Sequence, residues 1–72
     1  MPKTPRNLRQ AQAIRAFVRA GGVERAGKGS HRVVKMPNGH IVSLPVGVLK
    51  TGLLDFEINQ SGLTLDQFLD LL

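Results

Sequence analysis

Residues 27–32, Gly-Lys-Gly-Ser-His-Arg, bring together side chains that can act on a phosphate group. Histidine exchanges protons near neutral pH, and His31 places one imidazole between two cations. Lys28 and Arg32 supply charges that bind phosphate, and Ser30 adds a hydroxyl. The two glycines allow the backbone to approach a ligand closely. The combination predicts acid–base chemistry on a phosphate, with His31 as the base.

Both histidines also have plainer interpretations. The plainer interpretation of His31 is that it only begins a strand and packs on a neighbour. His40 follows the turn residues Asn38-Gly39, and we expect it to lie on the surface rather than to act as a second catalytic base. A two-histidine mechanism would need both rings within reach of one phosphate, and the sequence leaves that arrangement open.

Nucleotide-loop and metal chemistry are not indicated. Residues 22–28 match the pattern G-x-x-x-x-G-K, but Gly29 follows where a nucleotide-binding loop needs Ser or Thr. Cysteine is absent, which excludes disulfides, a cysteine nucleophile and cysteine-bound zinc. The carboxylates near the end of the chain have the spacing of solvent-facing helix positions: Asp55, Glu57, Asp66 and Asp70. We therefore expect no metal and no cofactor.

The charges are unevenly distributed along the chain. The net charge is +5. Residues 1–50 hold all ten basic side chains and only one acid, Glu24, which gives +9, whereas residues 51–72 hold four acids and no base, which gives −4. Such a basic segment attracts polyanions, nucleic acid first and anionic membranes second. No signal segment and no apolar run of about 18 residues is present, so we expect a soluble cytoplasmic protein.

The 72 residues suffice for one small core, with residues 1–6 as a flexible arm and 7–72 as a single domain. Apolar residues at helical spacing predict a first helix over residues 7–20, with Asn7 as N-cap and an end at Gly21-Gly22. Strands are predicted over residues 23–26, 31–36 and 41–44, with a turn at Pro37-Asn38-Gly39.

A second helix is predicted from its cap, Thr51, to Ser61-Gly62. The pair Thr64 and Gln67 forms the pattern of a capping box ahead of a short last helix. This order indicates an α+β fold with helices on one face of a three-stranded antiparallel sheet.

The sequence also contains short motifs in a characteristic order: Arg19-Ala20-Gly21, residues 28–33, Pro37-Asn38-Gly39, residues 41–46, and then Leu49-Lys50-x-Gly52-Leu53 and residues 61–64. Their order and spacing resemble the HicA (YcfA-like) toxins of bacterial and archaeal toxin–antitoxin pairs, over residues 7–72. Two features differ from the family. Gly47-Val48 follow Pro45-Val46, where the family often has a histidine, and Asp55 and Glu57 lie in a helix that is commonly basic.

The resemblance implies a fold like a double-stranded-RNA-binding domain and cleavage of mRNA that depends on His31. It also implies a HicB-type antitoxin protein that covers this site. Our leading hypothesis is therefore a toxin with metal-independent endoribonuclease activity, in which His31 is the general base and the RNA is bound by Lys28, Ser30, Arg32 and Lys35. The alternative is a non-catalytic RNA-binding or protein-interaction module of the same fold.

Overall fold

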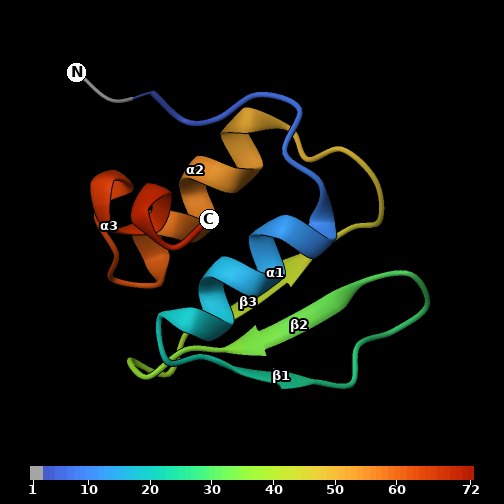
Figure 1. Ribbon diagram of the computed structural model, residues 1–72. Helices are drawn as coiled ribbons and strands as arrows, with labels where there is room; N and C mark the ends of the chain where they lie inside the picture. Colours follow the sequence, from blue (N-terminus) through green and yellow to red (C-terminus); the bar gives the residue numbers. More distant parts are fainter. Residues whose placement is uncertain (1–2) are drawn as a thin grey trace.

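The computed structural model describes residues 3–72 and shows an α+β fold in which helices and strands follow in the predicted order (Figure 1). Helix α1 precedes three strands, and two helices follow them. The elements are α1 (Gln10–Arg19), β1 (Val23–Arg25), β2 (Arg32–Lys35), β3 (Ile41–Leu44), α2 (Thr51–Gln60) and α3 (Leu65–Asp70). This confirms the expected layout of a three-stranded antiparallel sheet, two main helices and a short C-terminal helix.

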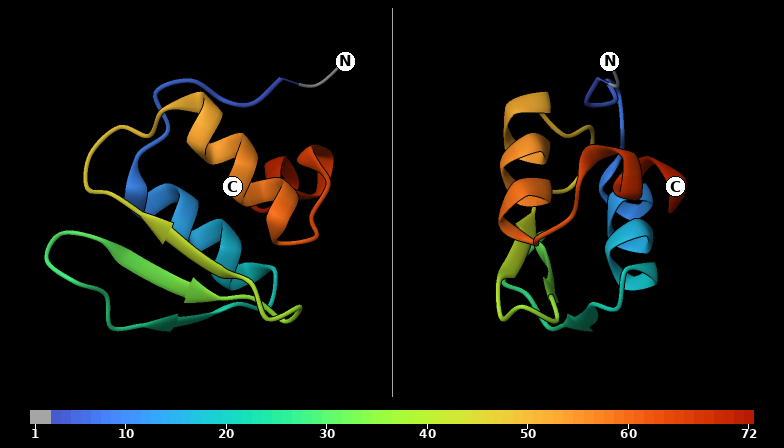
Figure 2. Two further views of the ribbon diagram at one scale, coloured as in Figure 1. Left: turned by 180° about the vertical axis from the view of Figure 1, so that it is seen from behind. Right: turned by 90° about the vertical axis from the view of Figure 1, so that its left-hand side faces the viewer.

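The sheet has the order β1-β2-β3, and both strand pairs are antiparallel. In the first pair Glu24 is opposite Val34, and in the second Val34 is opposite Val42. Because strand side chains alternate between faces, the buried Val34, Val42 and Leu44 all point to one face. Helix α1 lies over this face, and no helix covers the opposite face in the described part of the chain (Figure 2, right).

Helix α1 begins later than predicted. Asn7 is not the N-cap: its φ is 59°, and Arg9 takes the cap position instead. The backbone N–H of Arg9 donates to Gln12 Oε1 at 2.9 Å, which supplies a partner in the first turn. The predicted end is confirmed, because Gly21 has φ 103°, a conformation that glycine adopts without a steric cost.

The last two helices differ in how they begin. Thr51 is the first residue of α2 rather than its cap, and Lys50 occupies the cap position without a side-chain hydrogen bond. The capping box before α3 is confirmed: Gln67 N–H donates to Thr64 Oγ1 at 3.1 Å, and Thr64 N–H donates to Gln67 Oε1 at 2.9 Å. This reciprocal pair satisfies N–H groups that a helix start leaves free.

The core lies between α1, the covered face of the sheet and the last two helices. Phe17 of α1 and Phe68 of α3 are fully buried, with ring centroids 5.1 Å apart. This contact connects the short C-terminal helix to the first helix. The third phenylalanine, Phe56 on α2, is 55% exposed and lies outside this core.

The predicted N-terminal arm runs past the start of α2. Thr4 and Pro5 are half-buried, and Thr4 Oγ1 donates to Asp55 Oδ1 at 3.1 Å. Residues 1 and 2 of that arm lie outside the described residues.

Candidate nucleic-acid interface

The loop between β1 and β2 has a conformation that depends on its glycines. His31 N–H donates to the Lys28 carbonyl at 3.1 Å and closes a tight turn. Within this turn Gly29 has φ 60°, and nothing lies near the position of an added Cβ. Gly27 has a different role, because a Cβ there would lie only 2.2 Å from the carbonyl oxygen of His31. The loop folds back on itself at Gly27, where only glycine fits.

The candidate base is accessible. His31 directly precedes β2 and is exposed, as are Lys28 and Ser30 of the same turn. Its ring makes no hydrogen bond with any side chain or backbone group of residues 3–72. His31 therefore lies just before the strand rather than at its first position, and it is outside the packed interior.

Arg32 and Lys35, both predicted to bind RNA, point to opposite faces of β2. Arg32 is opposite the buried Leu44 and so faces the helices, where its guanidinium makes two hydrogen bonds with Glu24. The two N–O distances are 2.8 and 3.0 Å. Lys35 is exposed and follows the alternation of the uncovered face. The structure thus groups Lys35 with the uncovered face and places Arg32 in an ion pair.

The ion pair between Arg32 and Glu24 shifts the pKa values of both side chains. The hydrogen bonds from Arg32 hold the pKa of the Glu24 carboxyl below its ordinary value of 4.5. The same hydrogen bonds raise the pKa of Arg32, which stays charged. Both side chains are about 40% exposed, so solvent weakens their attraction.

Arg25 is a cation that the sequence analysis missed. It lies on β1 opposite Val33, so it projects from the same uncovered face as Lys35. A shallow hollow of about 300 Å³ on this face is lined by Gly21, Val23, Arg25, Lys35, Met36 and Pro37. The strand positions of the uncovered face carry no acidic side chain. Counting alternate positions from Val23 in the predicted strand is the signal that would have found Arg25.

His40 is not the surface residue that was expected. Its side chain is 24% exposed, and its Nε2 lies 2.8 Å from Oε1 of Glu57. Glu57 is itself buried, which corrects the expectation of solvent-facing carboxylates at its position. The other carboxylate oxygen, Oε2, accepts the N–H of Ser43 at 2.9 Å. Because α2 packs beside β3, a charge that the sequence placed on a helix surface becomes enclosed.

The two histidines do not share a site. Met36 N–H donates to the His40 carbonyl at 2.9 Å, so His40 sits beside Met36 at the far end of β2 from His31. At a rise of about 3.3 Å per residue, this places the two histidines about 16 Å apart. One phosphate cannot contact both rings.

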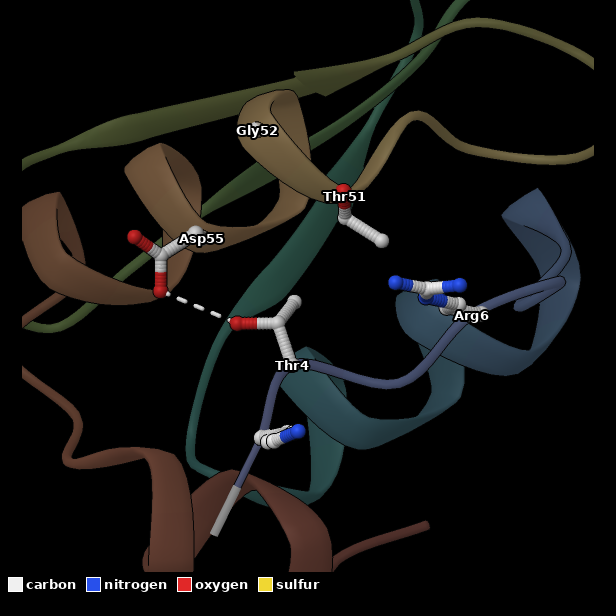
Figure 3. A pocket seen from close by; sticks show the side chains of 6 residues that line it. Thr4, Arg6, Thr51, Gly52 and Asp55 are labelled. Carbon is white, nitrogen blue, oxygen red and sulfur yellow. Dashed lines mark hydrogen bonds between the residues drawn. The ribbon is translucent and has the colours of Figure 1, made fainter. Parts of the chain in front are cut away.

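A separate pocket of about 320 Å³ lies where the N-terminal arm passes the first turn of α2 (Figure 3). It is lined by Lys3, Thr4, Arg6, Thr51, Gly52 and Asp55. Asp55 accepts the hydroxyl of Thr4 at one side, and Arg6 approaches from the other. Charges of both signs therefore line this pocket, unlike the uncovered face of the sheet.

None of the helices within residues 3–72 has the length and apolar character that a membrane crossing requires. No three His, Asp or Glu side chains gather there as they would around a metal ion. In comparisons with known proteins, no protein-family model and no curated protein matches this sequence.

Proposed function

We propose that this protein is a metal-independent endoribonuclease in which His31 acts as general base on a ribose 2′-hydroxyl. The observation that carries the proposal is the exposed imidazole at the end of a tight, glycine-containing turn that also exposes Lys28 and Ser30. The adjoining sheet face adds Arg25 and Lys35 without any acid. A polyanion can reach such a base, and the cations of the turn and of the uncovered face favour its approach.

The reaction is an internal displacement at phosphorus. His31 takes the proton of the 2′-hydroxyl, and the 2′-oxygen forms a bond to the adjacent phosphorus while the bond to the 5′-oxygen breaks. The leaving 5′-oxygen takes a proton from protonated His31 or from water, which yields a 2′,3′-cyclic phosphate and a 5′-hydroxyl. A positioned general base contributes roughly 10² to 10⁴ in rate, and a positioned donor that stabilises the growing negative charge about 10² to 10³.

The phosphate contacts are assigned to Lys28, Ser30 and Lys35, with Arg25 added from the geometry of the sheet. Arg32 belongs to the predicted set, but a phosphate would compete with Glu24 for its guanidinium. We therefore assign Arg32 the weakest phosphate contact of the group.

The biological role we propose is that of a toxin in a type II toxin–antitoxin system, acting on mRNA in the cytoplasm and neutralised by a HicB-type antitoxin. Support comes from the resemblance of residues 7–72 to HicA toxins and from the arrangement of the exposed His31 turn.

The alternative is a non-catalytic RNA-binding or protein-interaction module. Two observations support this alternative. His40 is held by Glu57 at a distance from His31, so it cannot act as a second base there. In addition, α2 carries acids where the family is commonly basic. An RNA-binding module would use the same cations to recognise A-form RNA by shape and phosphate contacts.

Replacement of the base separates these functions. His31→Ala should lower RNA cleavage by about 10²-fold or more and abolish growth arrest on expression. RNA affinity and the circular dichroism spectrum should be retained, because the ring is exposed. Asn59→Ala, at an exposed position of α2, is the matched control. Unchanged cleavage in His31→Ala would favour the non-catalytic module.

The chemistry is tested with the substrate. An RNA with one 2′-deoxyribose at the cut position lacks the attacking hydroxyl and should resist cleavage at that position only. Normal cleavage of this substrate would exclude the displacement described above.

A further inference from the structure

Gln10, the first residue of α1, joins three parts of the chain through one side-chain amide. Its Nε2 donates to the carbonyl oxygens of Ser30 and Leu44, both at 2.8 Å. Ser30 is the second-last residue of the β1–β2 loop, just before His31, and Leu44 ends β3. Figures 1 and 2 show the start of α1, this loop and the chain after β3 at the same end of the molecule. The residue is only 8% exposed.

The amide is well suited to this position and is itself held in place. A glutamine NH₂ group has two N–H donors, and here each carbonyl receives one. The backbone N–H of Gln10 donates to the Gly47 carbonyl at 3.0 Å, and the neighbouring Leu49 N–H donates to the Leu8 carbonyl at 2.8 Å. These bonds attach the first turn of α1 to the loop before α2. The backbone that carries the Gln10 amide is therefore held in place.

The contact with Ser30 fixes the peptide unit that leads into the candidate base, His31. The Ser30 carbonyl belongs to the same planar peptide unit as the N–H of His31. Gln10 holds that unit by its oxygen, and the Lys28 carbonyl holds it by its N–H. On the other side of His31, its own carbonyl packs against Gly27. The backbone of His31 is thus held on both sides, although its side chain is exposed.

We propose that Gln10 is a positioning residue, which holds the turn of residues 27–31 in the single arrangement that presents His31 to substrate. Its effect on cleavage rests on the proposed function, whereas its effect on the loop does not. Gln10 does not touch the reacting atoms; it acts through the Ser30–His31 peptide unit.

Two variants and two controls test this. Gln10→Met keeps the length and removes both donors, and Gln10→Glu keeps the shape but sets a carboxylate against two carbonyl oxygens. Ile58→Val, in the core and 1% exposed, controls for a general loss of stability. Gln60→Met, on the exposed end of α2, controls for the chemical change. Should Gln10→Glu fail to fold, Gln10→Met carries the test with Gln10→Asn, whose amide is too short to reach both carbonyls.

The loop is measured without reference to RNA, by amide hydrogen exchange at Ser30–Arg32 and by the rate of trypsin cleavage after Lys28. In both Gln10 variants we expect the exchange rate of these amides and the rate of trypsin cleavage to rise by about tenfold. This is the factor for loss of one buried hydrogen bond. The rise should exceed the change at core amides. In the control variants, amide exchange in the loop should rise no more than amide exchange in the core.

Cleavage kinetics then test the link to His31. We expect kcat to fall by up to about 10²-fold, the cost of a displacement of about 1 Å. KM should stay within about threefold, because the cations that bind RNA remain. Ile58→Val should leave both constants unchanged once the protein is folded.

The outcomes separate the two proposals. If exchange and trypsin cleavage at the loop stay at the wild-type rates, Gln10 does not position the loop, whatever the activity. If the loop loosens but kcat is unchanged, the loop is held without consequence for His31, and the positioning role is overturned. If the loop loosens and the wild type itself does not cleave RNA, the proposed nuclease function fails while the structural role of Gln10 stands.

Discussion

His40 and Glu57 form a largely buried side-chain pair, with Nε2 of the imidazole 2.8 Å from Oε1 of the carboxylate. Through its second oxygen, Glu57 also accepts the N–H of Ser43, on the edge of β3 that pairs with no strand. One carboxylate thus fastens α2 to the hairpin and satisfies an N–H of a sheet edge. Such edge groups otherwise invite pairing with another chain.

Removal of one partner of this pair should destabilise the fold. His40→Leu leaves the buried Glu57 carboxylate without one of its two hydrogen bonds, and we expect a loss of about 1 to 3 kcal/mol in the free energy of unfolding. Chemical denaturation measures this loss. In the double variant His40→Leu/Glu57→Leu no charge remains enclosed, so part of the loss should be recovered. Strictly additive losses would show that the two side chains are not coupled.

The cations of the His31 turn and of the uncovered face should be distinguishable from Arg32 by the salt dependence of RNA binding. Replacement of Lys28, Arg25 or Lys35 by Ala should weaken RNA binding and lower the slope of log affinity against log salt by roughly one each. Arg32→Ala should change the slope less, because its charge is shared with Glu24. Titrations at several salt concentrations provide the slopes. A larger change in slope for Arg32 than for Lys35 would contradict this assignment.

The ion pair between Glu24 and Arg32 predicts a pH dependence of stability. The pKa of Glu24 is lowered in the folded protein by the hydrogen bonds from Arg32. The stabilisation is therefore fully present above the ordinary pKa of 4.5 and is lost as the pH falls through the lowered value. The Tm of the wild type should exceed that of Glu24→Gln by a constant small amount near neutral pH. This gap should shrink below about pH 4.5, and a gap that widens in acid would contradict the prediction.

The two loop glycines should respond differently to a methyl group. Gly27→Ala would set its Cβ against the His31 carbonyl oxygen at 2.2 Å, so the turn must move and RNA cleavage should fall by about 10²-fold. Gly29→Ala finds open space, and its cost comes from φ 60°, about 1 to 2 kcal/mol of stability.

Gly29→Ala should therefore retain cleavage under conditions in which it is folded. Thermal melts and cleavage rates, measured on both variants, separate the two effects. Equal loss of activity in both would show that the shape of the turn is not set by the close approach at Gly27.

Local patterns were enough to predict the helices and strands, because their signals act over a few residues. The capping box of Thr64 and Gln67 needs only a spacing of three, and the end of α1 needs only a glycine that tolerates positive φ. The start of α1 was misplaced because Asn7 is itself at positive φ, where the chain pairs with the loop before α2 through Leu8 and Leu49. That pairing joins residues distant in sequence.

The sequence by itself determined which side chains are available: an imidazole in a glycine-containing cationic turn, a basic first part of the chain and an acidic last part. Only the tertiary structure decided which of these side chains are held by partners from other elements. Arg32 is paired because β1 places Glu24 beside it, His40 is held because α2 brings Glu57 to the edge of β3, and the His31 turn is held because Gln10 projects from α1. Each of these contacts crosses between elements, so it depends on packing and strand register, which no local pattern of residue types specifies.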